Sequence, residues 1–388
     1  MEAYLDNAAT TRVFDSVRDI MVNALSVDYG NPSSKHRKGM EAEQNLKEAT
    51  SIIAKSLKVE PKEIIFTSGG TESNNMALIG TALANQRAGK HIITTRFEHP
   101  SVHNPLIFLE EQGFRVSYVS VDSLGHINMK ELLDEICDET ILISVMYVNN
   151  EIGAVQDIAD ISKQIKAKKS DVLLHVDAIQ AFGKYKIYPK RMGIDLMSIS
   201  GHKIHGPKGS GVLFVKDRVK IKPIIFGGEQ QKGMRSGTEN VPAYVGLAQA
   251  IQEIYDHHEE KIEHLYAIKQ HMIKELRQLP EVTVNGINEE MELRETAPHI
   301  ISASFAGVRS EVLLHALEDR GIYVSSGSAC SSNHPGLSGT LVAIGVSKEL
   351  LDSTIRFSFS VNTTMEEIDY TISILKELLP KLRLFTRR

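Results

Sequence analysis

Short apolar runs alternate with helical stretches of mixed polarity between about residues 40 and 215. The segment EAEQNLKEATSIIAKSL (41–57) is typical of the helical stretches, because its apolar residues recur every three or four positions. The apolar runs are short and bounded by turn residues, as expected for strands that are buried on both faces. This alternation predicts an α/β fold with a mostly parallel sheet covered by helices on both sides. The seven predicted strands are 63–68, 91–96, 115–120, 141–148, 171–177, 196–200 and 211–215.

The pattern changes beyond about residue 250, where the apolar runs become shorter and the helical stretches dominate. This second pattern is typical of a smaller α+β unit. We predict one long polar helix at about 244–279, strands at 282–286 and 301–307, and helices at 310–321 and about 364–384.

The two patterns predict two domains in this chain of 388 residues. We place the large α/β domain at residues 15–250 and the small α+β domain at residues 1–14 and 251–388. No low-complexity linker separates the two patterns, so we expect the domains to pack closely. A ligand site is then expected between them.

Composition narrows the classes of function. A net charge of -5 with 24% charged residues lacks the basic excess of a nucleic-acid binder, so we expect no direct nucleic-acid partner. The longest apolar runs are far shorter than the ~20 residues that a helix needs to span a bilayer, and the N-terminus does not resemble a secretion signal. Only Cys137 and Cys330 are present, which fits a reducing compartment. We therefore expect a soluble, cytoplasmic protein without a membrane partner.

The segment TSGGTESNN (67–75) joins the end of a predicted strand to a helical pattern. Glycine lets a phosphate approach the backbone, and a helix N-terminus offers free N–H groups and a favourable dipole. Gly70 and Thr71 are therefore candidate phosphate contacts. A capped turn with Thr71 as the cap residue is the alternative. The motif matches neither a P-loop nor a dinucleotide fingerprint, which argues against an NTPase or a dinucleotide enzyme.

The segment SGHKIHGPKGSG (200–211) follows another predicted strand. Lys203 then lies at the carboxyl end of a strand, where parallel sheets bind ligands, and a desolvated lysine there can bond covalently to an aldehyde cofactor. The alternative is a solvated lysine in a surface loop. His202 and His205 have a possible metal spacing, but the neighbouring sequence supplies no third ligand, so we predict no metal.

Three further polar residues follow predicted strands. Asp177 ends a strongly apolar strand, where a carboxylate can pair with a pyridinium nitrogen or cap the next helix. His99 follows the strand at 91–96, where an imidazole can stack on a planar ring and move protons, or serve only as a hydrogen-bonded rim residue. Asn150 follows the strand at 141–148 and by itself is most simply a turn residue.

The two cysteines differ in their surroundings. Cys330 lies in SSGSACSS (325–332), a small and flexible segment that suits an exposed, reactive thiol. Cys137 lies in a predicted helix (NMKELLDEIC) next to a core strand, so we predict that it is an ordinary buried cysteine. Only Cys330 is predicted to react.

Taken together and in order, these segments resemble the cysteine desulfurase family of fold-type I pyridoxal-phosphate (PLP) enzymes. The similarity is closest to the branch that supplies sulfur for iron-sulfur clusters and tRNA thiolation. It extends over nearly the whole chain. The matching segments are YLDNAATT (4–11), YGNPSS (29–34), SGGTESNN (68–75), EHPSV (98–102), NNEIG (149–153), HVDAIQ (175–180), SGHKIHGPKG (200–209), RSGTEN (235–240), SSGSACSS (325–332) and IRFS (355–358).

The resemblance implies a role for each candidate. Lys203 would carry the PLP covalently, Asp177 would pair with its ring nitrogen, and His99 would stack on the ring. Gln180 and Asn150 would contact ring substituents, and Arg356 would clamp the substrate carboxylate with a bidentate fork. The phosphate contacts would be Gly70, Thr71, Ser200, His202 and, from the second subunit of a homodimer, Thr238.

The resemblance also implies the reaction. L-Cysteine would become L-alanine, and Cys330 would keep the sulfur as a persulfide for an acceptor protein. A selenocysteine lyase, an aminotransferase and a catalytically silent sulfur-carrier scaffold are the competing interpretations. One departure from the family is the segment NHPGLSGTLVAIG (333–345), which glycine and proline interrupt more often than in the family. We therefore expect the reach or the partner choice of the Cys330 loop to differ.

Overall fold

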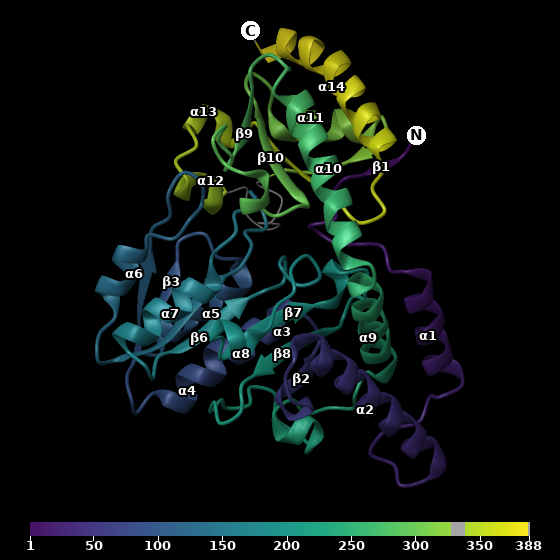
Figure 1. Ribbon diagram of the computed structural model, residues 1–388, viewed down its shortest axis with the longest axis vertical. Helices are drawn as coiled ribbons and strands as arrows, with labels where there is room; N and C mark the ends of the chain where they lie inside the picture. Colours follow the sequence, from purple (N-terminus) through teal and green to yellow (C-terminus); the bar gives the residue numbers. More distant parts are fainter. Residues whose placement is uncertain (327–337, 387–388) are drawn as a thin grey trace.

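A seven-stranded sheet forms the centre of the larger domain of the protein (Figure 1). The computed structural model describes residues 1–326 and 338–386. The strand order is β2-β8-β7-β6-β5-β3-β4, and all seven strands predicted from the sequence are confirmed. They are β2 (Ile64–Thr67), β3 (His91–Thr95), β4 (Arg115–Val119), β5 (Thr140–Met146), β6 (Leu173–Asp177), β7 (Leu196–Ser200) and β8 (Gly211–Val215).

Most neighbouring strands in this sheet are parallel. Only β8 runs against its neighbours β2 and β7. Parallel strands are connected by crossover helices, which cover both faces and require apolar side chains on each. Thus β5 is buried along its whole length, and its successive residues Leu142 and Ile143 enter different cores on the two faces.

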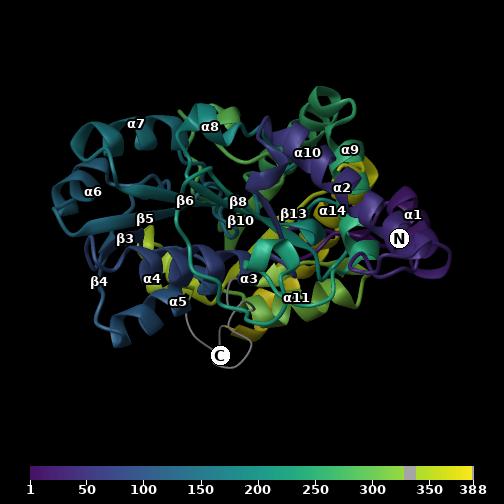
Figure 2. The ribbon, with the colours of Figure 1, turned by 90° about the horizontal axis from the view of Figure 1, so that it is seen from below.

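Helices form a layer on each side of this sheet (Figure 2). One face packs against η2 (Met76–Gly80), α4 (Thr81–Asn85) and α5 (Pro100–Glu111), and the other against α2 (Arg37–Leu57), α7 (Ile158–Lys168) and α9 (Val241–Tyr255). The remaining elements of this part are α1 (Asp15–Ser26), η1 (Pro61–Glu63), α3 (Gly70–Asn75), α6 (Met129–Glu135), α8 (Pro189–Met192), η3 (Gly201–Lys203) and η4 (Gln230–Gly233).

A smaller domain lies above the carboxyl ends of the parallel strands and has its own hydrophobic core (Figure 1). Its antiparallel sheet has the order β12-β13-β10-β9, and a short parallel pair joins β1 to β11. The strands are β1 (Ala3–Tyr4), β9 (Val282–Asn285), β10 (Ile300–Phe305), β11 (Ile322–Tyr323), β12 (Ser325–Ser326) and β13 (Thr354–Ser358). The helices are α10 (His258–Leu276), η5 (Leu293–Glu295), α11 (Ser310–Glu318), α12 (Gly339–Ala343), α13 (Lys348–Leu351) and α14 (Met365–Thr386).

The prediction of one long polar helix over about 244–279 is wrong. The chain forms two helices, α9 and α10, which are separated at Asp256 and His257, and His257 adopts a left-handed φ of 45°. Moreover, α9 is mostly buried. The two helices pack into different hydrophobic cores: Leu247 of α9 lies in the core of the large domain, and Leu265 of α10 lies in the core of the small domain. The turn lets the chain pass from one core to the other.

The prediction that Cys137 is buried is also wrong. Cys137 is exposed and lies just beyond the end of α6. Its Sγ accepts hydrogen bonds from Arg115 Nη2 at 3.2 Å and from Thr140 Oγ1 at 3.6 Å. Although partial burial raises the pKa of the Cys137 thiol, these donors and the Arg115 charge outweigh it and leave the pKa below its usual value.

Within residues 1–326 and 338–386, no helix combines the length and the apolar character that crossing a bilayer requires.

Candidate active site

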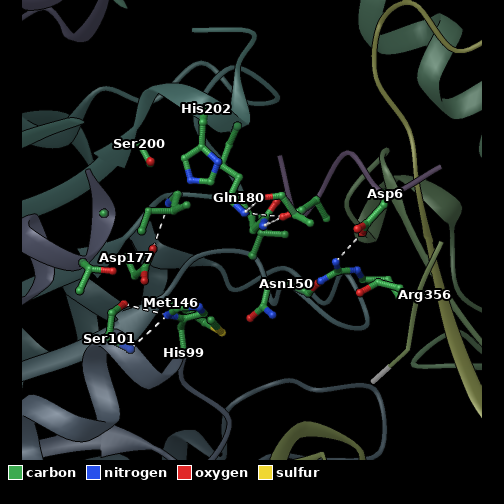
Figure 3. Close-up of a pocket in the computed structure, with 18 residues that line it drawn as sticks. Asp6, His99, Ser101, Met146, Asn150, Asp177, Gln180, Ser200, His202 and Arg356 are labelled. Carbon is green, nitrogen blue, oxygen red and sulfur yellow. Dashed lines mark hydrogen bonds and ion pairs between the residues drawn. The ribbon is translucent and has the colours of Figure 1, made fainter. Parts of the chain in front are cut away.

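A cavity of about 460 Å³ lies between the carboxyl ends of the large sheet and the small domain. Figure 3 shows Asp6 and Arg356 on one side, Asp177 and Ser101 on the other, and Gln180 between them. The sequence-predicted residues that line the cavity are Gly70, Thr71, His99, Asn150, Asp177, Gln180, Ser200, His202, Lys203 and Arg356.

Of the predicted site residues that the structure describes, only Thr238 does not line this cavity. Thr238 is exposed, on the segment between η4 and α9. Its predicted role involves a second subunit, so it remains a prediction. Cys330 lies outside the described residues, and the described chain before it ends with β12, where Ser325 pairs with Arg356 of β13.

One end of the cavity is suited to a phosphate. The helix α3 begins at Gly70 and continues through η2 and α4, so the N–H groups of its first turn face the end of the sheet. A Cβ atom at Gly70 would lie 2.1 Å from Ile179 Cδ1, so a larger residue here would have to displace the tip of that side chain. Ser200 Oγ is buried and has no hydrogen-bond partner among the described residues. Burial and the nearby charge of Lys203 lower the pKa of His202 to about 4, so His202 is neutral.

Asp177 ends β6 and is buried. Its Oδ1 accepts a hydrogen bond from the Ile179 N–H at 3.0 Å, and its Oδ2 accepts one from Asn74 Nδ2 at 2.8 Å. The residues after Asp177 form a turn rather than a helix, so Asp177 caps no helix. Burial raises the pKa of the Asp177 carboxyl. A cationic partner in the cavity would therefore be needed to keep it fully ionised.

The hydrogen bonds around His99 fix its tautomer. His99 caps α5 through Nδ1, which accepts from the Ser101 N–H at 3.1 Å. Asn74 Nδ2 donates to Ser101 Oγ at 2.9 Å, which leaves the Ser101 hydroxyl to donate to His99 Nδ1 at 2.8 Å. Because Nδ1 accepts twice, the proton of the neutral ring is on Nε2. Burial, and to a lesser extent Lys203 and Arg356, lower the pKa of His99 and favour this neutral form.

Lys203 ends η3, which follows directly after β7. Its Nζ donates to the carbonyl oxygens of Ala8 at 2.5 Å and Ala9 at 2.7 Å, so the N-terminal segment holds the amine at the cavity. The buried Lys184 Nζ donates to the Lys203 carbonyl oxygen at 2.9 Å. Burial and the charge of Lys203 lower the pKa of Lys184 to about 7.

Arg356 brings a cation to the opposite side of the cavity. It lies on β13, is buried, and donates through Nη2 to Asp6 Oδ1 at 2.8 Å and through Nη1 to the Asn150 carbonyl oxygen at 2.9 Å. Its Nε is buried without a partner among the described residues. The guanidinium is thus oriented from two sides. Its Nε–H remains as a donor from which a carboxylate can accept a hydrogen bond.

The donors and charges of this cavity fit PLP. The unpartnered Ser200 hydroxyl and the first turn of α3 suit the phosphate, Asp177 suits a protonated ring nitrogen, and Lys203 suits the aldehyde carbon. By contrast, no group of three or more metal-ligating side chains is found among the residues that the structure describes. The site therefore has the features of a PLP enzyme of the α/β class.

Comparisons with known proteins agree with this class. Residues 3–371 match the Aminotransferase class-V family. The chain is 42% identical over 383 residues to "Cysteine desulfurase IscS" of Dictyoglomus turgidum, covering 98% of this chain and 95% of that one. The solved structure of a "NifS-like protein" has a TM-score of 0.92 at 36% identity, with 98% and 100% of the two chains covered. A structure titled "SspA in complex with cysteine" has a TM-score of 0.80 at 33% identity, with 93% and 100% covered.

These matches show the family. The chain belongs to the cysteine desulfurases, a group of PLP-dependent enzymes within the class-V aminotransferases.

Several residues that shape the site were not singled out from the sequence. Asp6, Asn74 and Ser101 all lie within segments that resemble the family, but Asp6 pairs with Arg356, and Asn74 with Asp177 and Ser101, across long separations in sequence. Glu98 is similar: its Oε1 accepts from the Met146 N–H at 2.9 Å, and burial raises its pKa to about 8. The position of each within a matching segment is the only signal that the sequence offers.

Proposed function

We propose that this chain is a cysteine desulfurase that converts L-cysteine to L-alanine and passes the sulfur, through Cys330, to an acceptor protein. The observation that carries this proposal is one cavity lined by Lys203, His99, Asp177 and Arg356. These side chains supply a covalent anchor, a proton carrier, a ring partner and a carboxylate clamp. The names of the similar proteins support cysteine as the substrate.

The roles of the residues follow from their contacts. Bound PLP supplies an electron sink that makes the α-proton of an amino acid removable. Asp177, held by Ile179 and Asn74, would pair with the ring nitrogen of PLP, and its carboxylate would stabilise positive charge there. Arg356 orients the substrate carboxylate, and Lys203 moves the α-proton. His99 offers its Nε2–H to the reacting centre, because its Nδ1 is already occupied.

The sulfur step is assigned to Cys330. Its thiolate attacks the substrate sulfur, the carbon–sulfur bond breaks, and the bonding electrons remain with the carbon that becomes the methyl group of alanine. The pairing of Ser325 with Arg356 supports this assignment, because the segment that carries Cys330 begins beside the proposed carboxylate clamp.

The assignment is tested by the mass of the intact protein after exposure to L-cysteine without reductant. We expect the wild-type chain to gain one sulfur atom, and Cys330→Ser to gain none while keeping its PLP. Cys137→Ser is the matched control, and it matters because Cys137 is exposed. If Cys137→Ser loses the added sulfur and Cys330→Ser keeps it, the two cysteines have been assigned the wrong way round.

We also propose a homodimer in which Thr238 of one subunit reaches the phosphate site of the other. The exposure of Thr238 supports this, as do several large apolar side chains that are exposed on and after α1. A second copy would bury them. These apolar residues are Val22, Leu25, Val27, Tyr29 and Met40. Sedimentation equilibrium of the PLP-bound enzyme is expected to give twice the chain mass, and a monomer at micromolar concentration would contradict the shared site.

The acceptor is proposed to be an iron-sulfur scaffold or a tRNA-thiolation protein of the cytoplasm. The similarity to proteins named IscS and the scarcity of cysteine in the chain support this proposal. Recovery of the protein's sulfur on a co-purified cytoplasmic acceptor tests it, and exclusive recovery on free thiols would count against it.

A further inference from the structure

A buried histidine of the small domain contacts the proposed cofactor residue Gln180. His299 Nε2 lies 3.2 Å from Gln180 Oε1, and Gln180 Nε2 donates to the Ala8 carbonyl oxygen at 2.9 Å. His299 is 1% exposed and immediately precedes β10. Its own carbonyl oxygen accepts from the Phe359 N–H at 2.9 Å, which fixes its backbone in the small domain.

These two contacts determine which way the Gln180 amide faces. A carbonyl oxygen can only accept, so the Gln180 NH₂ group must face Ala8 and its Oε1 must face His299. His299 then has to donate from Nε2, and the second Gln180 N–H remains as the group offered to a ligand in the cavity. With the amide reversed, Gln180 would present an acceptor instead.

The surroundings of His299 hold it in the donating form. Burial, followed by the charges of Lys184, Lys269, Arg356 and Lys203, lowers its pKa well below the usual value, so the ring is neutral. Its single neutral proton is therefore on Nε2, and Nδ1 is left buried without a partner among the described residues. An unpartnered buried acceptor is unfavourable for stability. Among the described residues, the side chain of His299 therefore has one hydrogen-bond partner, Gln180.

We propose that His299 is a positioning residue. By donating to Oε1 it secures the orientation that the Ala8 carbonyl sets, in which Gln180 presents an N–H, rather than an oxygen, to the ring oxygen of PLP. This inference rests on the proposed contact between Gln180 and the cofactor. The ring oxygen of PLP is an acceptor that carries negative charge when ionised, and a fixed N–H stabilises that charge. His299 thereby links the position of the small domain to the electronic state of the cofactor.

Two substitutions separate the hydrogen bond from packing. In His299→Gln the amide nitrogen is as many bonds from Cα as Nε2 of histidine, so the donor is kept. In His299→Met the side chain has similar reach and no donor. We expect the visible spectrum of the PLP-bound His299→Gln enzyme to match that of the wild type. We expect His299→Met to lose part of its yellow form at fixed pH, and its kcat to fall about 10-fold with KM changed by less than about two-fold.

A double substitution tests whether His299 acts through Gln180. Gln180→Met removes the amide, so adding His299→Met to it should change the spectrum and kcat by less than about two-fold. Equal losses in both backgrounds would overturn the proposal, because His299 would then act by packing. An altered spectrum in His299→Gln would also overturn it, even if His299→Met does not fold. If Gln180→Met alone has the wild-type spectrum, the proposed cofactor contact of Gln180 fails and this inference fails with it, while the desulfurase function is still measured by alanine release.

Discussion

Lys203→Ala should fold, bind PLP only noncovalently, and lose turnover by about 10⁴-fold or more, because one substitution removes both the covalent anchor and the base that moves the α-proton. Lys203 Nζ contacts the carbonyl oxygens of Ala8 and Ala9, two residues that line the cavity, and the Ala8 oxygen also accepts from Gln180 Nε2. Folding should therefore survive the loss. Borohydride reduction followed by peptide mass analysis measures the covalent link, and alanine release measures turnover.

The matched control is Lys208→Ala. Lys208 belongs to the same SGHKIHGPKG segment but is exposed and does not line the cavity. It should keep both the covalent link and the turnover of the wild type. The assignment of Lys203 is contradicted if the reduced cofactor is found on another lysine, such as Lys184 or Lys208.

Asp177→Asn should lower turnover by about 10²–10³-fold, comparable to the loss of one electrostatic contact to the reacting group, with little loss of folding. The introduced amide can still accept from the Ile179 N–H, but its NH₂ group would face Asn74 Nδ2. The Asn74 amide can turn its unpartnered Oδ1 to that NH₂ group, but its Nδ2 then no longer donates to Ser101. The substitution thus removes the ring-nitrogen partner and disturbs the donor that fixes the tautomer of His99.

Asp195→Asn provides a control for burial. Asp195 is also a buried aspartate, and it accepts from the Leu174 N–H at 3.0 Å and pairs with Lys166 and Lys216 away from the cavity. It should lose stability and keep the turnover per bound PLP. Chemical denaturation and alanine release distinguish the two variants. Turnover of Asp177→Asn close to wild type would mean that Asp177 has only a structural role at the end of β6.

The strands of the large sheet could be predicted because the signal for each strand lies within a short stretch of sequence. A strand covered by helices on both faces needs an unbroken apolar run, as in β5, and such runs stand out against helical spacing. The end of α9 was not predictable in the same way. The helical pattern continues through Asp256 and His257, which are neither glycine nor proline, and the break arises because the two helices pack in different cores.

In the candidate site, too, some residues could be predicted from local sequence and others could not. Asp177, His99 and Lys203 were found from their places after strands, because the carboxyl ends of parallel strands meet at one edge of the sheet. Gln180 and Arg356 depended on the resemblance to a known family. Their side-chain partners, and the Asn74 partner of Asp177, are more than a hundred residues away in sequence, so only the folded chain brings them together.

The exposure of Cys137 was missed for a related reason. The residue is apolar in character and was predicted to lie within a helix, which favours burial, but α6 ends at Glu135 and the thiol reaches Arg115 at the surface. Burial here depends on where the helix ends, and sequence patterns locate helix ends poorly.

The product of a single turnover, with the PLP-bound enzyme in excess over L-cysteine and no reductant present, tests the proposed reaction as a whole. We predict one L-alanine for each cysteine consumed, with the sulfur retained on the protein at Cys330. Release of a keto acid with the sulfur still attached would identify an aminotransferase. Alanine from selenocysteine alone would identify a selenocysteine lyase, and no alanine from either substrate would contradict catalysis at Lys203 altogether.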